Sequence, residues 1–219
     1  MTGVDSKIAY RKEMARFDTG KLVGSNKGRG HNQTTASGNP YYCFDPQPEE
    51  IHITDIAAQL ARICRFNGAL RDDIGHYSVA QHCCLVSDHC PPELALEGLL
   101  HDAHEAYIGD MSKPVKMNLH LLSGKQARDW WKVLEHHNEL AVRRRFGLPN
   151  HMAPAVKEQD YLAVTTEHRD LQVHTGLVDW GNMPTPWPET IQPWNSFRAR
   201  SEFLRRFYAL YNGDCHDDR

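Results

Sequence analysis

The chain has 219 residues and contains no apolar run of the length that crosses a bilayer, nor a hydrophobic signal core within residues 1–27. These absences exclude a membrane span and argue against export, so we expect a cytoplasmic protein. One-sided charge is also missing, since 25 Lys and Arg stand against 28 Asp and Glu. Without a basic excess we expect neither a stable nucleic-acid partner nor attachment to a membrane surface.

Paired cysteines are missing as well. The six cysteines include no C-x-x-C pair and no evenly spaced framework, and several lie inside apolar helical patterns. This usage is typical of reduced, packed thiols, and it argues against a closed zinc site made of thiolates. Strand-like alternation is scarce too, and there is no internal repeat.

Helical periodicity is what the sequence does contain. Helix starts and stops recur along it, among them Ser78, Gly109, Gly147 and Asn195, each next to a run of apolar residues at helical spacing. The pattern predicts an all-α protein, a single helical bundle of about six or seven helices. We expect a flexible N-terminal extension over 1–40, the folded domain over 41–212, a disordered tail over 213–219, and an irregular segment from Trp180 to Trp194.

Histidine and carboxylate side chains lie on helices that are otherwise apolar. His82 lies on one such segment. The pair His101-Asp102 follows an apolar run within a predicted buried helix that begins at Pro91-Pro92 and ends near Gly109, and Asp160 faces inward on the helix that starts at Pro154. Burying these groups is costly unless they are paired or hold a cation. A second His-Asp pair, at 216–217, lies in a polar terminus and carries no such implication.

The four residues form a mixed nitrogen and oxygen ligand set from three helices. Such a set accommodates Mn²⁺, Co²⁺, Zn²⁺, Fe²⁺ or Mg²⁺ and leaves two positions open on a six-coordinate ion, a layout suited to hydrolysis assisted by the metal. Glu105 lies three residues after Asp102 and so rises over the same helix face. Taken singly, His82 and Asp160 are equally compatible with a packed core histidine and a buried hydrogen-bond partner.

The joint pattern resembles the HD-domain metal-dependent phosphohydrolases, and within them most the 5′-deoxynucleotidase branch. The similarity rests on His82, the stretch from Leu99 to Lys116 that reads LLHDAHEAYIGDMSKPVK, and the stretch VKEQD that ends at Asp160. It covers about residues 55–171. The resemblance implies an all-α HD domain, in agreement with the helical periodicity.

The resemblance also implies roles for particular residues. Glu105 would orient or deprotonate the attacking water, and Arg65 would steer the phosphate while Phe66, where the family has Trp, packs on the sugar or base. Added phosphate stabilisation from Lys113 or Lys116 is compatible with their charge. The expected metal ligands are His82, His101, Asp102 and Asp160; the expected catalytic residues are Glu105, Asp110 and Arg65; the expected substrate contacts are Arg65, Phe66, Asp110, Met111, Ser112, Lys113 and Lys116.

The function that the resemblance implies is hydrolysis of a deoxynucleoside 5′-phosphate, in which a water activated by a divalent metal attacks the α-phosphorus and releases deoxynucleoside and phosphate. Three alternatives stay open. The first is a dNTP triphosphohydrolase that releases triphosphate, with dATP as a candidate substrate. The others are a phosphodiesterase and an HD module that binds nucleotide without turnover. The expected partner is a small deoxynucleotide. Self-association through the aromatic-rich C-terminal helix is also open, although core packing explains that helix equally well.

Overall fold

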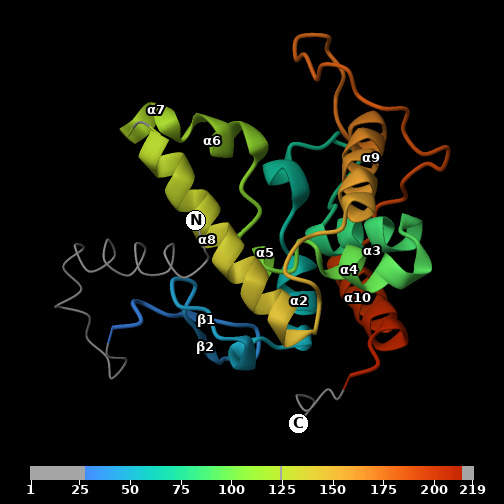
Figure 1. The fold of residues 1–219 in the computed structure, drawn as a ribbon. Helices are drawn as coiled ribbons and strands as arrows, with labels where there is room; N and C mark the ends of the chain where they lie inside the picture. The colour runs from blue at the N-terminus through green and yellow to red at the C-terminus, as the bar shows by residue number, and fades with distance from the viewer. Residues whose placement is uncertain (1–27, 124, 214–219) are drawn as a thin grey trace.

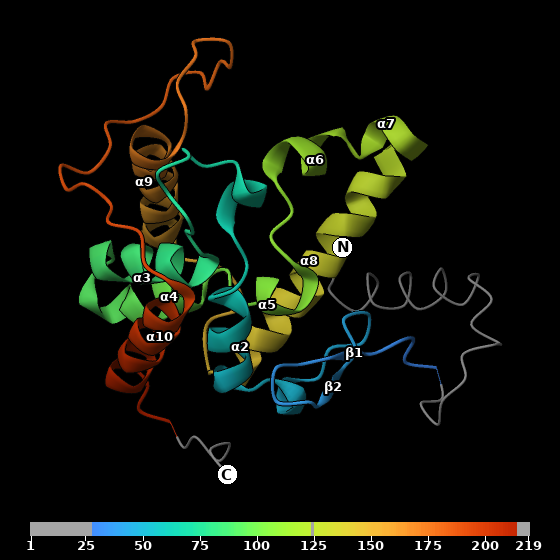
Figure 2. The ribbon, with the colours of Figure 1, turned by 180° about the vertical axis from the view of Figure 1, so that it is seen from behind.

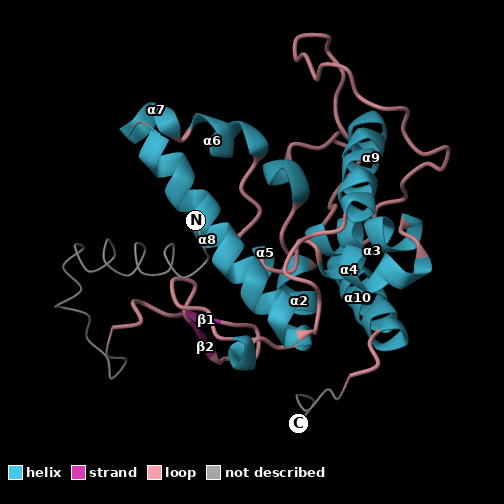
Figure 3. Cartoon of the chain, viewed as in Figure 1, coloured by secondary structure: helices cyan, strands magenta, loops and turns pink. Residues whose placement is uncertain are grey.

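The structure is a computed structural model that describes residues 28–213 except Gly124. Seven of its α-helices have six or more residues, and the single sheet has two short strands, so the predicted all-α class is confirmed (Figure 3). The elements are β1 (Gln33–Thr34), β2 (Pro40–Tyr41), η1 (Pro48–Glu50), α2 (Ile53–Leu60), η2 (Arg65–Gly68), α3 (Val79–His89), η3 (Pro92–Leu94), α4 (Ala95–Leu100), α5 (Glu105–Ile108), α6 (Lys113–Asn118), α7 (His120–Ser123), α8 (Lys125–Arg145), α9 (Pro154–Leu171) and α10 (Ser196–Leu210).

The main core lies where α2, α3, α4, α10 and the C-terminal end of α8 meet (Figure 1). Its largest buried side chains include Ile56 on α2, Leu99 on α4, and Phe203 and Phe207 on α10. Core packing therefore accounts for two aromatic residues of α10, whereas Phe197 on the same helix is exposed. The helices α6 and α7 pack on the N-terminal half of α8, away from this core (Figures 1 and 2).

Helix boundaries follow local signals in several places. The Ser78 hydroxyl accepts a hydrogen bond from the Gln81 amide at the start of α3, and the Asn195 side chain does the same for Arg198 at the start of α10. Gly109 ends α5 with a positive φ of 81°, which a glycine adopts without strain. These caps are as predicted from the sequence.

Residues 28–39 differ from the flexible extension that we expected there. Strands β1 and β2 pair antiparallel, with Gln33 opposite Tyr41, so the expected boundary at residue 40 falls inside a hairpin. The Arg29 guanidinium forms ion pairs with Asp45 and Glu50, and the Ser37 amide donates to Asp55. Strands of two residues are too short to give a sequence signal. The rest of the predicted extension and most of the predicted tail lie outside the described residues.

The segment from Trp180 to Trp194 is irregular, as predicted, and it is also packed. Residues 172–195, all of them described, contain no helix or strand. Trp187 is buried against α3 and α9 and stacks on His89, with ring centroids 3.5 Å apart. The side-chain amide of Gln81 on α3 donates to the Gln192 carbonyl and accepts from the main-chain N–H of Trp194. These two bonds fix the end of the segment. We call residues 187–194 the strap.

None of the helices in the described ranges is both long enough and apolar enough to span a bilayer.

Candidate metal centre

The four predicted ligands come together from three parts of the fold. His82 lies on α3, His101 and Asp102 lie between α4 and α5, and Asp160 lies on α9. Both α3 and α4 contact α9, which brings residues some 60 positions apart in the chain to one place. Both imidazoles are buried, whereas the side chains of Asp102 and Asp160 are 18% and 35% exposed. The centre therefore opens to solvent on the side of the two carboxylates.

A close approach of α3 and α4 brings the two histidine rings together, with centroids 5.1 Å apart and planes tilted by 57°. Gly98 on α4 lies so near α3 that a Cβ at this position would be 3.2 Å from the Ser87 Cα and 2.8 Å from the Cys90 Sγ. A larger residue here would push the two helices apart. Glycine at position 98 thus sets the separation at which His82 and His101 meet.

The segment 91–109 was predicted to be one helix, and this prediction was wrong at the centre itself. α4 ends at Leu100, and the following amides of Ala103, Glu105 and Tyr107 bond to the carbonyl three residues back. Such tight turns change the angular spacing of successive side chains relative to an α-helix. The sequence neighbours His101 and Asp102 point into one centre from this turn.

The donor atoms of His82, His101 and Asp102 are placed to share one divalent cation, and Asp160 lies beside them. His82 Nε2 lies 3.2 Å from His101 Nε2, 3.6 Å from Asp102 Oδ2 and 3.1 Å from Asp160 Oδ1. His101 Nε2 lies 3.2 Å from Asp102 Oδ2 and 3.7 Å from Asp160 Oδ1. Two donors about 2.1 Å from an ion are about 3.0 Å apart when adjacent and about 4.2 Å apart when opposite. All five distances lie in this range. His82, His101 and Asp102 have donor atoms that all lie within 4.8 Å of one another and are able to share one ion, whereas Asp160 is close to both imidazoles but falls outside this group.

The outer nitrogens of both rings are already engaged. His82 Nδ1 lies 2.6 Å from the Glu167 carboxylate, and His101 Nδ1 lies 2.7 Å from the Gly98 carbonyl. Because both partners only accept, each Nδ1 carries the proton and donates it. Unless the rings are charged, two Nε2 lone pairs then face each other across 3.2 Å in a buried space. A cation between them removes that conflict, and this is the observation that favours a metal here.

The pKa shifts indicate that the centre attracts positive charge. Burial lowers the pKa of His101, but the carboxylates of Asp102 and Asp160 outweigh burial and raise it well above its usual value. Burial raises the pKa of Asp160, yet the hydrogen bonds from both histidines hold it below its usual range. The four groups thus jointly favour a positive charge, which a proton or a metal ion would supply.

Glu167, which the sequence analysis missed, is fully buried behind the centre. Its Oε1 accepts from His82 Nδ1 and from the Tyr77 hydroxyl at 2.7 Å, and its Oε2 accepts from Arg65 Nη2 at 3.2 Å. Burial works against ionisation, but Arg65, His82 and Tyr77 lower the pKa of Glu167 to about 2. The spacing of seven residues from Asp160 places Glu167 on the same helix face, but in a helix of mixed pattern this spacing alone does not indicate that a glutamate is buried.

Arg65 lies beside the centre, as the predicted phosphate contact should. Its amide donates to the Tyr77 carbonyl, which pairs the segment 63–65 with the start of α3. Its Nη1 lies 3.8 Å from Asp102 Oδ2 and 3.7 Å from Asp110 Oδ2. Phe66 follows with φ 55°, a conformation that is rare for an aromatic residue and occurs preferentially at functional sites. The ring of Phe66 lies 5.4 Å from the Arg65 guanidinium carbon.

Glu105, the predicted proton acceptor, is buried at the start of α5. Its Oε2 has no hydrogen-bond partner among the described residues. Burial, together with repulsion from Asp102 and Asp110, raises the pKa of Glu105 well above its usual value. A buried carboxyl with a raised pKa and an open oxygen suits the transfer of a proton.

The remaining predicted substrate residues follow the centre in the chain. Asp110 is half-buried and contacts Arg65, while Met111 and Ser112 are half-buried in the connection to α6. Lys113 is exposed, and no described contact brings it to the four candidate ligands. The Lys116 ammonium lies 2.6 Å from the Glu135 carboxylate on α8. Its charge is thus largely compensated within the fold.

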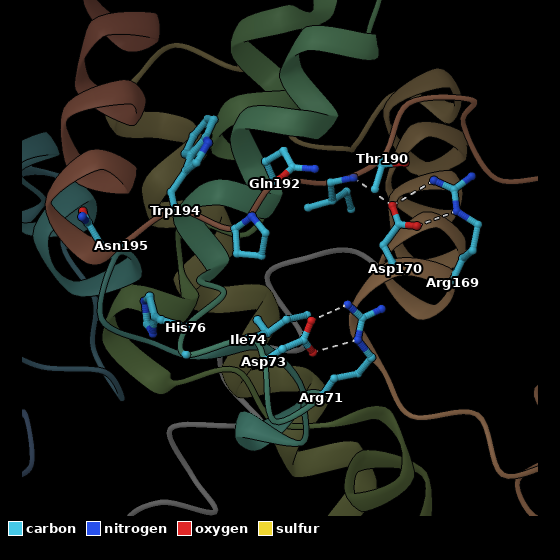
Figure 4. A pocket seen from close by; sticks show the side chains of 13 residues that line it. Arg71, Asp73, Ile74, His76, Arg169, Asp170, Thr190, Gln192, Trp194 and Asn195 are labelled. Carbon is cyan, nitrogen blue, oxygen red and sulfur yellow. Dashed lines mark hydrogen bonds and ion pairs between the residues drawn. The ribbon is translucent and has the colours of Figure 1, made fainter.

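A separate hollow of about 590 Å³ lies between the loop 71–76, the end of α9 and the strap (Figure 4). None of the four candidate ligands lines it. Its arginines are paired with neighbouring carboxylates, Arg71 with Asp73 and Arg169 with Asp170. Hydrogen bonds from Arg169 to the Trp187 and Glu189 carbonyls, and from the Ile191 amide to Asp170, hold the strap against α9. We assign the hollow no part in the chemistry.

Comparison with known proteins places the chain among relatives. It is 39% identical to the protein YfdR of Escherichia coli (strain K12) over 179 residues, which cover 80% of this chain and 93% of YfdR. It is 36% identical to the protein RCAP_rcc00048 of Rhodobacter capsulatus over 144 residues, 63% of this chain and 69% of that protein. Both relatives are described as uncharacterized, and no family model matches the chain. The extent of the first similarity shows that the chain belongs to the family of YfdR.

Proposed function

We propose that the protein is a divalent-metal-dependent nucleotide phosphohydrolase of the HD type, which cleaves a deoxynucleoside 5′-phosphate into deoxynucleoside and phosphate. The observation that carries the proposal is the pair of buried Nε2 atoms 3.2 Å apart, flanked by the carboxylates of Asp102 and Asp160. Two imidazoles and two carboxylates are a ligand set that suits several divalent ions.

His82, His101, Asp102 and Asp160 would hold the cation. A bound divalent ion would polarise a phosphoryl oxygen and lower the pKa of water to near neutrality. Because the two histidines are fully buried and both aspartates are partly exposed, a substrate has access only from the aspartate side. The protein's part at the centre is to fix the donors and to leave that side open.

Arg65 and Glu105 supply the remaining chemistry of the proposal. The Arg65 guanidinium beside Asp102 is a donor suited to phosphoryl oxygens, and it stabilises the charge that develops on them. Glu105 would accept the proton from the attacking water, because its free oxygen lies in the same buried region and its pKa is raised above its usual value. A positive charge held by the neighbouring Asp102 would favour the ionised form of Glu105 that this step needs.

The monophosphate is the preferred substrate of this proposal, and the triphosphate is the second candidate. A triphosphate brings more negative charge than a monophosphate and needs more free cations to hold it. In the described part of the chain, Lys116 is paired with Glu135, and Lys113 has no contact with the centre. Arg65 is in contact with the centre but is itself paired with Glu167, so little uncompensated positive charge is left for a triphosphate, which favours the smaller substrate.

Purified protein loaded with Mn²⁺ or Co²⁺ and assayed against dNMPs, dNTPs and cyclic nucleotides tests the proposal. Released phosphate and released triphosphate are measured separately. We expect phosphate and deoxynucleoside from dNMPs. Triphosphate from dNTPs would select the second candidate, and cleavage of cyclic nucleotides would select a phosphodiesterase. Nucleotide binding without turnover in every case would identify a module that only binds.

A further inference from the structure

We propose that Glu167 is a positioning residue. Its one carboxylate orients both a ligand of the cation site, His82, and the cationic group of the anion site, Arg65. Through one oxygen it sets which nitrogen of His82 is free to bind a metal, and through the other it holds Arg65. The inference rests on the proposed function for the identity of the anion as a phosphate. The contacts of Glu167 do not depend on that function, because all of them join residues that the structure describes.

The first half of the argument concerns His82. Glu167 Oε1 lies 2.6 Å from His82 Nδ1, on the side of the ring away from the other three candidate ligands. A carboxylate accepts only, so the proton is fixed on Nδ1 and the lone pair on Nε2 points into the centre. The Tyr77 hydroxyl donates to the same oxygen at 2.7 Å. Tyr77 thereby keeps this oxygen turned toward the ring.

The second half concerns Arg65. Glu167 Oε2 accepts from Arg65 Nη2 at 3.2 Å, while Nη1 of the same guanidinium points to Asp102 and Asp110. Glu167 is fully buried, so this ion pair is not weakened by water. Holding one end of the planar group fixes the direction of the other end. Arg65 is therefore oriented toward the centre before any substrate arrives.

Both oxygens of Glu167 are occupied by donors, so the carboxylate cannot turn without losing one contact. A carboxamide at this position offers only one acceptor oxygen and places an NH₂ group where the second oxygen was. In Glu167→Gln either His82 or Arg65 must then face a donor. If the NH₂ group faces His82, the ring proton moves to Nε2, which can then no longer bind a metal. If the NH₂ group faces Arg65, the guanidinium moves away from the centre.

The test measures two affinities in Glu167→Gln: that for Co²⁺, by calorimetry, and that for inorganic phosphate at saturating Co²⁺. We expect at least one of them to weaken by about 10- to 100-fold, the range typical of changes behind a metal ligand. Glu158→Gln is the matched control, because Glu158 is exposed on the same helix, and both affinities should stay within about twofold of wild type. Wild-type values for both ligands in Glu167→Gln overturn the inference.

A measurement on the unaltered protein covers the case in which Glu167→Gln does not fold. Wild type labelled with ¹⁵N-histidine and loaded with Zn²⁺ should show His82 with its proton on Nδ1 and with Nε2 free of hydrogen. A proton on Nε2 overturns the inference. Neither experiment depends on turnover. If wild type binds Co²⁺ and phosphate as expected but hydrolyses no nucleotide, the proposed function is contradicted, while the role of Glu167 is unaffected.

Discussion

His82 Nε2 and His101 Nε2 face each other at 3.2 Å, and each ring has its other nitrogen hydrogen-bonded to a group that only accepts. This relationship is costly without a positive charge between the rings. Loss of a neighbouring carboxylate should therefore be measurable in two ways, as loss of bound metal and as loss of turnover.

Asp102→Ala should abolish both metal binding and hydrolysis, because it removes the donor that lies 3.2 Å from His101 Nε2. Metal content by atomic emission and phosphate release are the two measurements. Glu139→Ala, a change of a carboxylate on α8 outside the candidate centre, serves as the control and should keep both. Retained activity in Asp102→Ala would remove the site assignment.

Glu105→Ala should keep the metal and lose turnover. Glu105 is not among the four converging donors, and removal of a group that transfers a proton costs about 10²- to 10⁴-fold in rate. The comparison is kcat and metal content of the variant against wild type. If Glu105→Ala loses the metal as Asp102→Ala does, then Glu105 is a ligand and not a proton acceptor.

Metal should stabilise the folded protein. A ligand that binds only the native state raises the free energy of unfolding by about 2.7 kcal/mol at a hundred times its Kd. We therefore expect a higher Tm with Co²⁺ than with a chelator in wild type. Asp102→Ala provides the contrast, and its Tm should be the same in both conditions. An equal Co²⁺ shift in both proteins would mean that the ion binds elsewhere.

Arg143→Ala should destabilise the fold strongly. Arg143 is 1% exposed and forms a buried ion pair with Glu97, which also accepts from the Ala153 amide. Leaving a buried charge without its partner costs about 3–5 kcal/mol. The neighbouring Arg144 is exposed, so Arg144→Ala should change the free energy of unfolding by only about 0.5 kcal/mol or less. Chemical denaturation of the two variants gives the comparison, and equal effects would contradict the burial of the pair.

Acid should loosen the strap through Asp170. The hydrogen bonds from Arg169 and from the Ile191 amide outweigh burial and lower the pKa of this carboxyl. A lowered pKa in the folded state gives stability that is complete above the usual pKa of an aspartate and is lost as the pH falls through the folded value. The protection of the Ile191 amide hydrogen against exchange, measured relative to an unstructured chain at the same pH, should therefore fall below about pH 4. In Asp170→Asn this exchange should be fast at neutral pH too; slow exchange there would show that another group holds the strap.

The residues that could be predicted from the sequence are those whose surroundings in the chain are apolar. His82, His101 and Asp160 interrupt helical stripes of buried residues, so periodicity alone indicated that they point inward. Glu167 lies on a helix with a mixed pattern, where a glutamate is usually exposed. Arg143 stands in a run of three arginines and reads as part of a solvated helix end. Their burial depends on partners far away in the chain, which periodicity does not reveal.

Local departures from regular helix were also beyond the sequence. The break of helix between Leu100 and Glu105 carries no glycine or proline, and the tertiary contacts of α4 and α5 decide it. The hairpin of residues 33–41 depends on bonds from its side chains to distant elements. Both features were missed for the same reason, since no short stretch of sequence contains the interactions that produce them.

The side chain of Gln33 donates to the Tyr107 carbonyl, and that of Gln59 donates to the Ala106 carbonyl at 2.5 Å. Both side-chain amides thus hydrogen-bond to main-chain carbonyls of α5, the short helix that begins with Glu105. A truncation that starts the protein at residue 41 would remove Gln33 and the strand beneath it while leaving every catalytic and metal-binding candidate in the chain. Shortened forms of the protein should accordingly retain this segment, although it lies more than forty positions before the first candidate ligand.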